Sequence, residues 1–279
     1  MKLSLPEYDT SGIGGGWSFI ANFIRAMGDS ITDYESSDIF FIPSASMVSR
    51  DEVECAKQDG KKIVLRIDNI IRNSRNRNTG MSRMKDFSDW ADLVIFQSKF
   101  AEELLNPFLR TENFKIILNS ADETIYNTNN RVNGSNRYFY GKHSSDETKN
   151  WEMARVAYQQ VQENIPEATL NLVGRYDSNL QDYNFDFYNN ESYKYWGYIT
   201  DPQAMANIYK QSDYFVYTYF NDACSNSLIE SILCGAMIYD PFGMAQTGGT
   251  PEIFKKASVP KYFELKRMAD DYIKAMDRL

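Results

Sequence analysis

The sequence predicts an α/β protein made of parallel β-sheets covered by helices. Short β-branched and aromatic runs alternate with segments in which apolar residues recur every three or four positions. This alternation is typical of successive strand–helix–strand units. It restarts after Asn127 to Asn136 (NTNNRVNGSN), a polar stretch without periodicity that is typical of a linker. A chain of 279 residues is long enough for two domains of about 130 to 150 residues each.

The first half predicts strands at Lys2 to Leu5, Asp38 to Ile42, Lys62 to Ile67, Leu93 to Phe96 and Phe114 to Leu118. Helical patterns between them cover Trp17 to Met27, Arg50 to Gln58, Met81 to Ala91 and Lys99 to Leu109. Gly14, Gly15 and Gly16 precede the first helix, at a turn where a ligand can approach the bare backbone closely. A tight turn without a ligand explains the same glycines, so both interpretations stay open.

The second half repeats the pattern. Its predicted strands are Arg137 to Tyr140, Thr169 to Val173, Tyr193 to Trp196, Asp213 to Phe220 and Met237 to Tyr239. Its predicted helices are Trp151 to Gln162, Pro202 to Lys210, Ser225 to Cys234 and a long amphipathic tail helix from Tyr262 to Leu279.

Composition and charge narrow the possible environments. The net charge of −8 disfavours nonspecific binding to nucleic acid or anionic lipid. No apolar run is long enough to span a membrane, and the N-terminus does not resemble a signal peptide. The odd number of cysteines, without metal-ligand spacing, indicates free thiols in a reducing compartment. We therefore expect a cytoplasmic protein.

One segment departs from the acidic average. Arg66 to Lys85 carries six basic residues, Arg72 and Arg75 among them, against the single acid Asp68. Interleaved Asn and Gly residues indicate an ordered polar loop rather than a helix face. The segment is either a solvated loop paired with acids elsewhere or a patch that faces an anionic substrate or acceptor.

The stretch Asp222 to Gly235 (DACSNSLIESILCG) carries the clearest chemistry. A strand runs into a polar elbow and then into a helix, whose first residues Ser225, Asn226 and Ser227 suit a helix N-terminus. Backbone N–H groups there attract phosphate or sugar oxygens, while the carboxylates of Asp222 and Glu230 accept hydrogen bonds from hydroxyls. The elbow therefore predicts a site for an anionic, hydroxylated ligand.

Two lysines occupy a second strand-to-helix turn, Gly141 to Asn150 (GKHSSDETKN). Lys142 and Lys149 could both reach a bound diphosphate as point charges, although surface lysines explain the same pattern. His143 is the one histidine in the sequence, which excludes a site built from several histidines.

Several stretches, in this order, together resemble family 4 glycosyltransferases. They are Arg66 to Asn69 (RIDN), Val94 to Leu104 (VIFQSKFAEEL), Ile116 to Tyr126 (IILNSADETIY), Leu172 to Arg175 (LVGR), Trp196 to Tyr198 (WGY), Asp222 to Gly235 and Gly248 to Ile253 (GGTPEI). The resemblance implies a compact GT-B fold, in which two Rossmann-like parallel-sheet domains face a central cleft. It implies an acceptor-side domain at 1–130, a donor-binding domain at 131–260 and a C-terminal helix at 261–279 that packs back toward the first domain.

The resemblance also implies roles for the donor-side residues. Asp222 and Glu230 match the two acids of the family's E-x7-E motif, although the family usually has Glu at the first position. Glu230 would hold the ribose of the donor nucleotide, and Asp222 would contact the transferred sugar. Lys142 and Lys149 match the basic pair that neutralises the donor diphosphate.

On the acceptor side, Gly15 and Gly16 match the glycine loop that closes over the diphosphate and acceptor. The catalytic-domain histidine of many relatives is missing, and Arg66 or Asp68 is expected to line that space. Arg72 and Arg75 would add positive charge on the same side.

The resemblance implies a retaining hexosyl- or pentosyltransferase that moves a sugar from a nucleotide-diphosphate donor to a glycan or lipid-linked acceptor. Neither a metal ion nor another cofactor is expected, because lysines and a helix N-terminus can stabilise the leaving phosphate. Two alternatives stay open. One is a glycosyltransferase that acts on nucleic acid, which the basic segment suggests, and the other is a noncatalytic module that binds sugar nucleotides or glycans.

Overall fold

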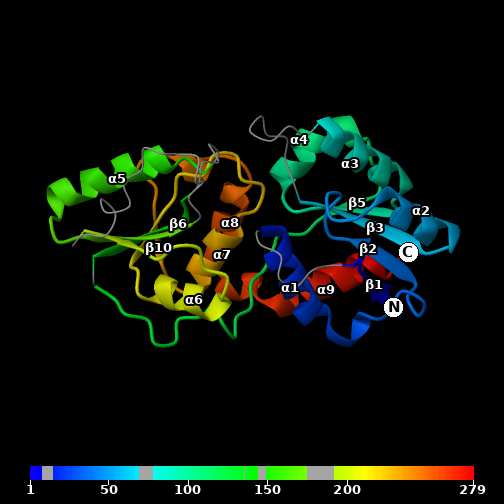
Figure 1. Cartoon of the computed structure of the whole chain (residues 1–279), viewed down its shortest axis with the longest axis horizontal. Helices are drawn as coiled ribbons and strands as arrows, with labels where there is room; N and C mark the ends of the chain where they lie inside the picture. The colour runs from blue at the N-terminus through cyan, green and yellow to red at the C-terminus, as the bar shows by residue number, and fades with distance from the viewer. Residues whose placement is uncertain (8–14, 69–77, 135, 144–148, 175–191) are drawn as a thin grey trace. The chain divides into compact units, whose positions relative to one another are not determined.

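The computed structural model describes residues 1–7, 15–68, 78–134, 136–143, 149–174 and 192–279. These residues form two compact units (Figure 1). Unit 1 comprises Met1–Ala121 and Glu252–Leu279, and unit 2 comprises Asp122–Pro251. The chain therefore leaves unit 1 after residue 121 and returns to it at residue 252, whereas the sequence placed these two boundaries after residues 130 and 260.

Unit 1 contains a parallel sheet whose strands follow the chain, in the order β1-β2-β3-β4-β5. The strands are β1 (Leu3–Ser4), β2 (Ile39–Ile42), β3 (Lys62–Ile67), β4 (Leu93–Phe96) and β5 (Phe114–Ile116). The connecting helices are α1 (Gly15–Met27), α2 (Arg50–Gln58), α3 (Asn78–Trp90) and α4 (Lys99–Leu109), with a short 3-10 turn η1 (Gly28–Ser30) after α1. Strands β2 and β4 are buried at every residue, as expected when helices cover both faces of a parallel sheet.

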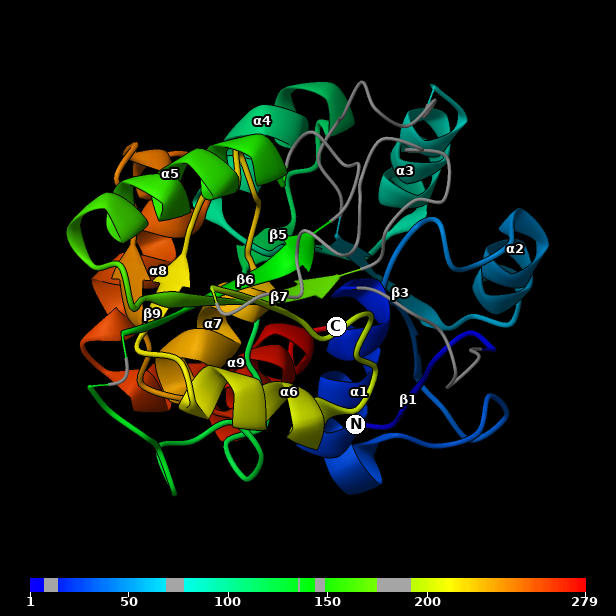
Figure 2. The same cartoon turned by 60° about the vertical axis from the view of Figure 1, so that its left-hand side comes forward.

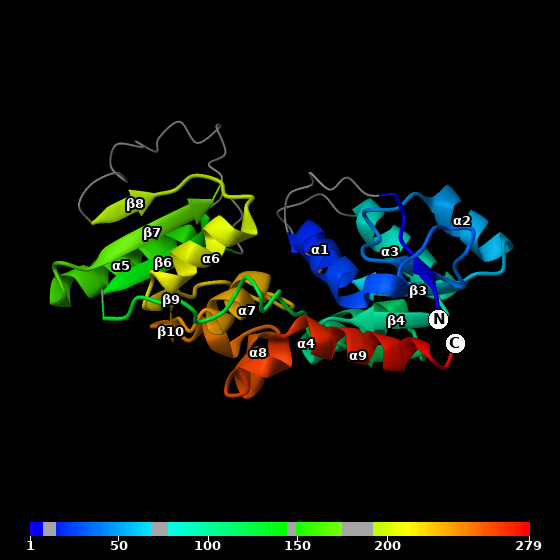
Figure 3. The same ribbon diagram turned by 90° about the horizontal axis from the view of Figure 1, so that it is seen from below.

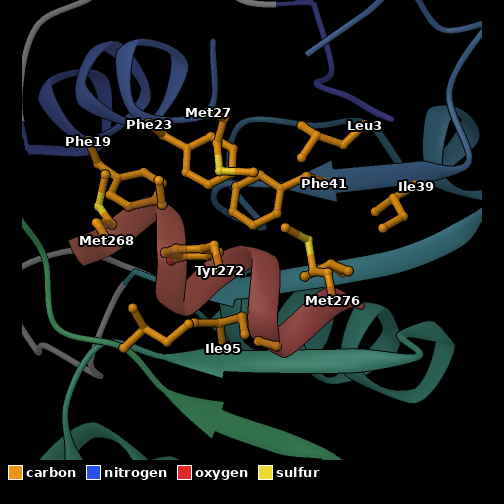
Figure 4. Packing of buried hydrophobic residues seen from close by; sticks show 14 of the residues in the cluster. Leu3, Phe19, Phe23, Met27, Ile39, Phe41, Ile95, Met268, Tyr272 and Met276 are labelled. Atoms are coloured by element: carbon orange, nitrogen blue, oxygen red, sulfur yellow. The ribbon is translucent and has the colours of Figure 1, made fainter. Parts of the chain in front are cut away.

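The last helix of the chain, α9 (Leu265–Met276), completes the core of unit 1. Tyr272 is 1% exposed, and its ring packs against Phe23 at 5.0 Å and Phe41 at 5.6 Å between ring centroids. Figure 4 shows this ring between α1 and the sheet, with Phe19 beside it. Residues from the two ends of the chain thus share one apolar core.

The C-terminal helix begins later than the sequence predicted. A 3-10 turn, η4 (Pro260–Phe263), comes first, and Glu264 has an extended conformation that separates it from α9. Pro260 fits the first position of the turn, where a missing N–H costs nothing. The apolar periodicity continues across this break, so the pattern alone did not reveal it.

Unit 2 contains a second parallel sheet, with the strand order β10-β9-β6-β7-β8. The strands are β6 (Arg137–His143), β7 (Thr169–Gly174), β8 (Tyr193–Tyr195), β9 (Tyr214–Val216) and β10 (Met237–Tyr239). The helices are α5 (Trp151–Asn164), α6 (Pro202–Lys210) and α7 (Asn226–Leu233), followed by the 3-10 turn η3 (Met244–Gln246). Figures 1 and 2 show α5 on one face of this sheet and α6 and α7 on the other.

The strand order of unit 2 reverses between β6 and β9. The chain starts in β6 and moves outward through β7 to β8 (Figure 3), and it then returns to the other side of β6 for β9 and β10. Crevices outside the carboxyl ends of the strands at such a reversal are where open α/β sheets bind ligands. We therefore expect a ligand-binding site of unit 2 at the carboxyl ends of β6 and β9.

Three further features of unit 2 differ from the sequence prediction. Strand β9 is shorter than the predicted run Asp213 to Phe220, because residues 217–220 continue beyond the last ladder pair, Val216 with Tyr239. The expected linker is attached to unit 2, where Arg131 donates to the carbonyl of Cys234 and the backbone N–H of Gly134 to Asp213. Helix α8 (Thr250–Ala257) was not predicted, and its residues lie on both sides of the boundary after residue 251. In the described part of the chain, no helix is long and apolar enough to cross a membrane.

Candidate active site

Lys149 and Asp222 meet at the reversal point of the second sheet. Lys149 follows β6 and Asp222 follows β9, so the two neighbouring strands bring together residues 73 positions apart in the sequence. The Nζ atom of Lys149 lies 3.1 Å from Oδ2 of Asp222, and each side chain is only 11% exposed. The pair is therefore a largely buried ion pair at the position where the topology predicts a ligand.

The backbone of Lys149 is fixed by buried hydroxyls. Its carbonyl accepts hydrogen bonds from the Tyr140 hydroxyl at 2.6 Å and from Thr218 Oγ1 at 3.1 Å. Asn150, which starts α5, has a positive φ of 56°, a conformation that asparagine tolerates better than most residues. The Tyr219 ring lies 5.2 Å from the ammonium group, within the range of a cation–π contact. These contacts hold the lysine at the end of β6.

Asp222 is held at the elbow between β9 and α7. Its Oδ1 accepts the backbone N–H of Cys224 at 3.2 Å, and its carbonyl accepts that of Gly249 at 2.8 Å. Gly248 has a φ of +63°, and a Cβ atom there would lie 2.6 Å from the Asp222 carbonyl oxygen. Only glycine fits this approach, so Gly248 and Gly249 of the GGTPEI stretch lock the elbow in place.

Helix α7 begins as the sequence predicted. Ser225 is its N-cap, and the Ser225 Oγ accepts the backbone N–H of Leu228 at 3.4 Å. Ser225 Oγ also lies 3.1 Å from Ser227 Oγ, and Asn226 is the first helical residue. The first turn therefore presents small polar side chains and the positive end of the helix dipole beside the Lys149–Asp222 pair.

Glu230 lies on α7 and is 8% exposed. The Tyr209 hydroxyl, on α6, lies 3.1 Å from its Oε2 and donates to it. Burial, reinforced by the Glu230 charge, raises the pKa of Tyr209 well above its usual value, so the phenol stays protonated and remains a donor. A carboxylate fixed in this way can accept hydrogen bonds from the hydroxyls of a ligand.

Two comparisons with known proteins find nothing and one finds many structures. No protein-family profile matches the sequence, and no curated protein sequence is similar to it. Among solved structures, Anabaena HepE in complex with UDP-glucose superposes with a TM-score of 0.74 at 14% identity, over 100% of both chains. The chain has the GT-B fold.

Other GT-B glycosyltransferases superpose on most of the chain. The pneumococcal O-GlcNAc transferase GtfA, solved with UDP and GlcNAc, gives a TM-score of 0.63 at 13% identity and covers 86% of this chain and 56% of its own. Sucrose-phosphate synthase from Thermosynechococcus elongatus gives 0.58 at 14% identity, over 87% of this chain and 70% of its own. The fold predicted from the resemblance is confirmed, and these low identities carry no information about individual residues.

On unit 1, the structure places Arg66 in β3, facing α1. Its guanidinium donates to the Pro43 carbonyl and to the amide oxygens of Gln97 and Asn119, and it stacks 3.6 Å from the centroid of the Phe19 ring. Arg66 is 2% exposed, and these contacts are all with groups of unit 1 itself. The guanidinium is therefore built into the sheet, and its predicted acceptor-side role remains a prediction.

Asp68 and the glycines lie at the edge of the described residues. The Asp68 carbonyl accepts a hydrogen bond from Gln97 Nε2 at 2.8 Å, which ties the end of β3 to the Arg66 network. Gly15 and Gly16 form the start of α1, where a Cβ on Gly16 would lie 3.3 Å from the Met47 sulfur. Both residues are thus at a helix N-terminus, as a ligand-facing loop requires.

The remaining predicted site residues lie outside what the structure describes. Gly14, Arg72 and Arg75 fall in undescribed segments, and of Lys142 only the backbone, in β6, is described. Among the described residues, no group of three or more His, Cys, Asp or Glu side chains could hold a metal ion.

Residues that the sequence did not single out support the site. Tyr140 and Thr218 anchor Lys149, and Gly248 sits against Asp222. A signal existed for the glycine, since GGTPEI was among the stretches that carry the resemblance. The roles of the Tyr140 and Thr218 hydroxyls could not be predicted, because the sequence around each residue indicates only an ordinary buried strand.

Proposed function

We propose that the protein is a metal-independent, retaining glycosyltransferase that moves a hexosyl or pentosyl group from a nucleotide-diphosphate sugar to a glycan or lipid-linked acceptor. The observation that carries the proposal is the Lys149–Asp222 pair at the reversal of the second sheet, directly before the α7 N-terminus, with Glu230 on the same helix. Such a site offers a cation and backbone donors to a diphosphate and carboxylates to hydroxyls. The UDP and UDP-glucose bound to Anabaena HepE, a structure of the same fold, lend further support.

The chemistry follows from these groups. The bond between the anomeric carbon and the diphosphate oxygen breaks, and its electron pair stays on the leaving phosphate. Lys149 and the N–H groups at the start of α7 stabilise that charge, which is the role a divalent ion has in other transferases. The acceptor hydroxyl attacks the face that the phosphate leaves, so the configuration is retained, and its proton passes to the phosphate.

Each side of the reaction has proposed residues. On the donor side, Glu230 holds the ribose hydroxyls and Lys142 assists Lys149. On the acceptor side, Gly15 and Gly16 close over the diphosphate, and Arg66 with Asp68 lines the acceptor space. A cytoplasmic location belongs to the same proposal and rests on the free thiols Cys55, Cys224 and Cys234.

Donor binding tests the proposal directly. UDP, GDP and ADP sugars should be screened by thermal shift, because a ligand that binds only the folded state raises the melting temperature. At least one donor should also be hydrolysed slowly in the absence of acceptor. A protein that binds no nucleotide sugar would refute the proposal, and binding without any hydrolysis or transfer would indicate a noncatalytic module.

Glu230→Gln tests the nucleotide assignment. We expect the affinity for the donor nucleotide to fall about 10- to 100-fold, the usual loss when a charged acceptor becomes neutral. Glu163→Gln, an exposed glutamate at the end of α5 in the same unit, is the matched control and should leave the affinity unchanged. Unchanged affinity in Glu230→Gln, measured by titration calorimetry, would remove the ribose assignment while leaving the reaction class open.

A further inference from the structure

Both carboxylate oxygens of Asp222 contact other groups of the protein. Oδ2 lies 3.1 Å from the Lys149 ammonium, and Oδ1 accepts the backbone N–H of Cys224 at 3.2 Å. The backbone of each partner is fixed as well, by the Tyr140 hydroxyl on Lys149 and by the N–H of Gly249 on Asp222. The carboxylate therefore points at the lysine before any ligand arrives.

The length of the aspartate side chain explains these two contacts. Aspartate has one methylene less than glutamate, the residue that the sequence resemblance implies at this position. Its carboxylate consequently stays close to the elbow backbone, where it meets the N–H of Cys224, instead of extending toward a ligand. In this chain the acid faces the cation that the proposed reaction uses for the diphosphate.

We infer that Asp222 is a positioning residue that holds Lys149 and limits how tightly the diphosphate binds. The inference rests on the proposed function. A diphosphate and the Asp222 carboxylate compete for one largely buried ammonium group, so the lysine must loosen its contact with the carboxylate when it pairs with the diphosphate. The carboxylate thus offsets the charge of the ammonium group, orients the lysine, and lowers the affinity for the nucleoside diphosphate left after transfer.

This role predicts an effect opposite to the one expected of a sugar contact. If Asp222 holds Lys149, Asp222→Asn releases the ammonium group from its competing carboxylate and binding of UDP becomes tighter, by roughly tenfold. If Asp222 instead holds only the hydroxyls of the transferred sugar, the same substitution leaves UDP binding unchanged and weakens only the sugar nucleotide.

The experiment measures UDP and UDP-glucose affinity by titration calorimetry, with GDP and ADP as further probes, in the wild type, Asp222→Asn, Lys149→Met and the double variant. We expect Asp222→Asn to bind UDP about tenfold more tightly and to turn over more slowly, with product release limiting. In the Lys149→Met background the Asn substitution should change UDP affinity less than twofold, because the acid acts through the lysine. Asp222→Glu keeps the negative charge, so it should bind UDP no more tightly than the wild type does.

The outcomes separate this inference from the proposed function. UDP affinity that stays unchanged or falls in Asp222→Asn, or that rises equally without Lys149, overturns the positioning role while leaving the transferase intact. A wild type that binds neither UDP, GDP nor ADP overturns both. Circular dichroism, together with labelling of the buried Cys224 and Cys234 that stays far slower than in denaturant, verifies that each variant is folded, so a loss of structure cannot imitate a loss of affinity.

Discussion

Each of the two sheets buries a cation near the carboxyl ends of its strands, and the groups that surround the two cations differ in charge. In unit 1, whose strands follow the chain without reversal, Arg66 is surrounded by carbonyl and amide oxygens and an aromatic ring. In unit 2, whose order reverses between β6 and β9, Lys149 faces the carboxylate of Asp222. Among the described residues, Arg66 is held by fixed neutral groups, whereas Lys149 is paired with a carboxylate.

The two kinds of cation differ in how easily they can exchange a protein partner for a ligand. A guanidinium is a planar fork, and at Arg66 several of its N–H groups are already used by acceptors that belong to the sheet. An ammonium is a compact point charge that can exchange one anionic partner for another. The contacts of Arg66 therefore fix the unit 1 sheet, whatever part it has toward an acceptor, and Lys149 is the cation that we propose responds to a diphosphate.

Removing the unit 1 cation should have the largest effect on stability. Arg66→Met removes the donor to three buried oxygens, of which Gln97 Oε1 keeps a second donor in Asn119 Nδ2. We expect a loss of about 3 kcal/mol, since each unsatisfied buried group costs about 1–3 kcal/mol. Arg83→Met, on the exposed surface of α3, should change stability by less than about 0.5 kcal/mol. Denaturant unfolding measures both, and a similar small change in the two variants would contradict the structural role of Arg66.

Removing the unit 2 cation should lower the free energy of unfolding less than removing Arg66 does, but it should weaken UDP binding. Lys149→Met leaves Asp222 buried without its countercharge, although the remaining exposure of the pair moderates the penalty to about 2 kcal/mol. UDP affinity should fall at least about tenfold, because a buried charge-assisted contact is lost. Lys194→Met, an exposed lysine of the same unit, is the control for stability. Binding of UDP at wild-type strength in Lys149→Met would place the diphosphate elsewhere.

Thiol labelling assigns each loss of stability to its unit. Cys55 in unit 1 is exposed and should react quickly, whereas Cys224 and Cys234 in unit 2 are buried. Burial raises the pKa of Cys234 to about 12, so at pH 7 it reacts only when unit 2 opens. Lys149→Met should speed labelling of the buried pair by roughly 30-fold for a loss of about 2 kcal/mol, and Arg66→Met should not. The same acceleration in both variants would show that the units do not open independently.

Much of the fold followed from local pattern. The elbow and the start of α7 were predictable because Ser225, the apolar helix face and Gly235 are all local signals. The strand order was not, because nothing in the sequence says that the chain returns to β6 after β8. The pairing of Lys149 with Asp222 depends on that order, so each residue could be proposed for a donor site but not for contact with the other.

Arg66 shows the opposite case, in which a signal was present and was interpreted differently. It was grouped with the arginines that follow it as part of a basic loop, yet it lies within the run Lys62 to Ile67, a strand otherwise apolar after its first residue. Alternation along that strand puts Arg66 on the same face as Val64, which is toward α1. A charged residue inside such a run indicates a buried, satisfied side chain more often than a ligand contact.

The position of α9 has a consequence for the order in which the molecule assembles during synthesis. Domains generally fold as units, the N-terminal one first, as the chain emerges. Here all residues of unit 2 have been synthesised once residue 251 has been made. Phe19, Phe23 and Phe41 of unit 1 cannot complete their packing until Tyr272 has also been synthesised. Unit 1, which contains the first residues of the sequence, is therefore the last unit to complete its core. A chain that ends before α9 would contain a folded unit 2 and a unit 1 whose aromatic side chains remain exposed to solvent.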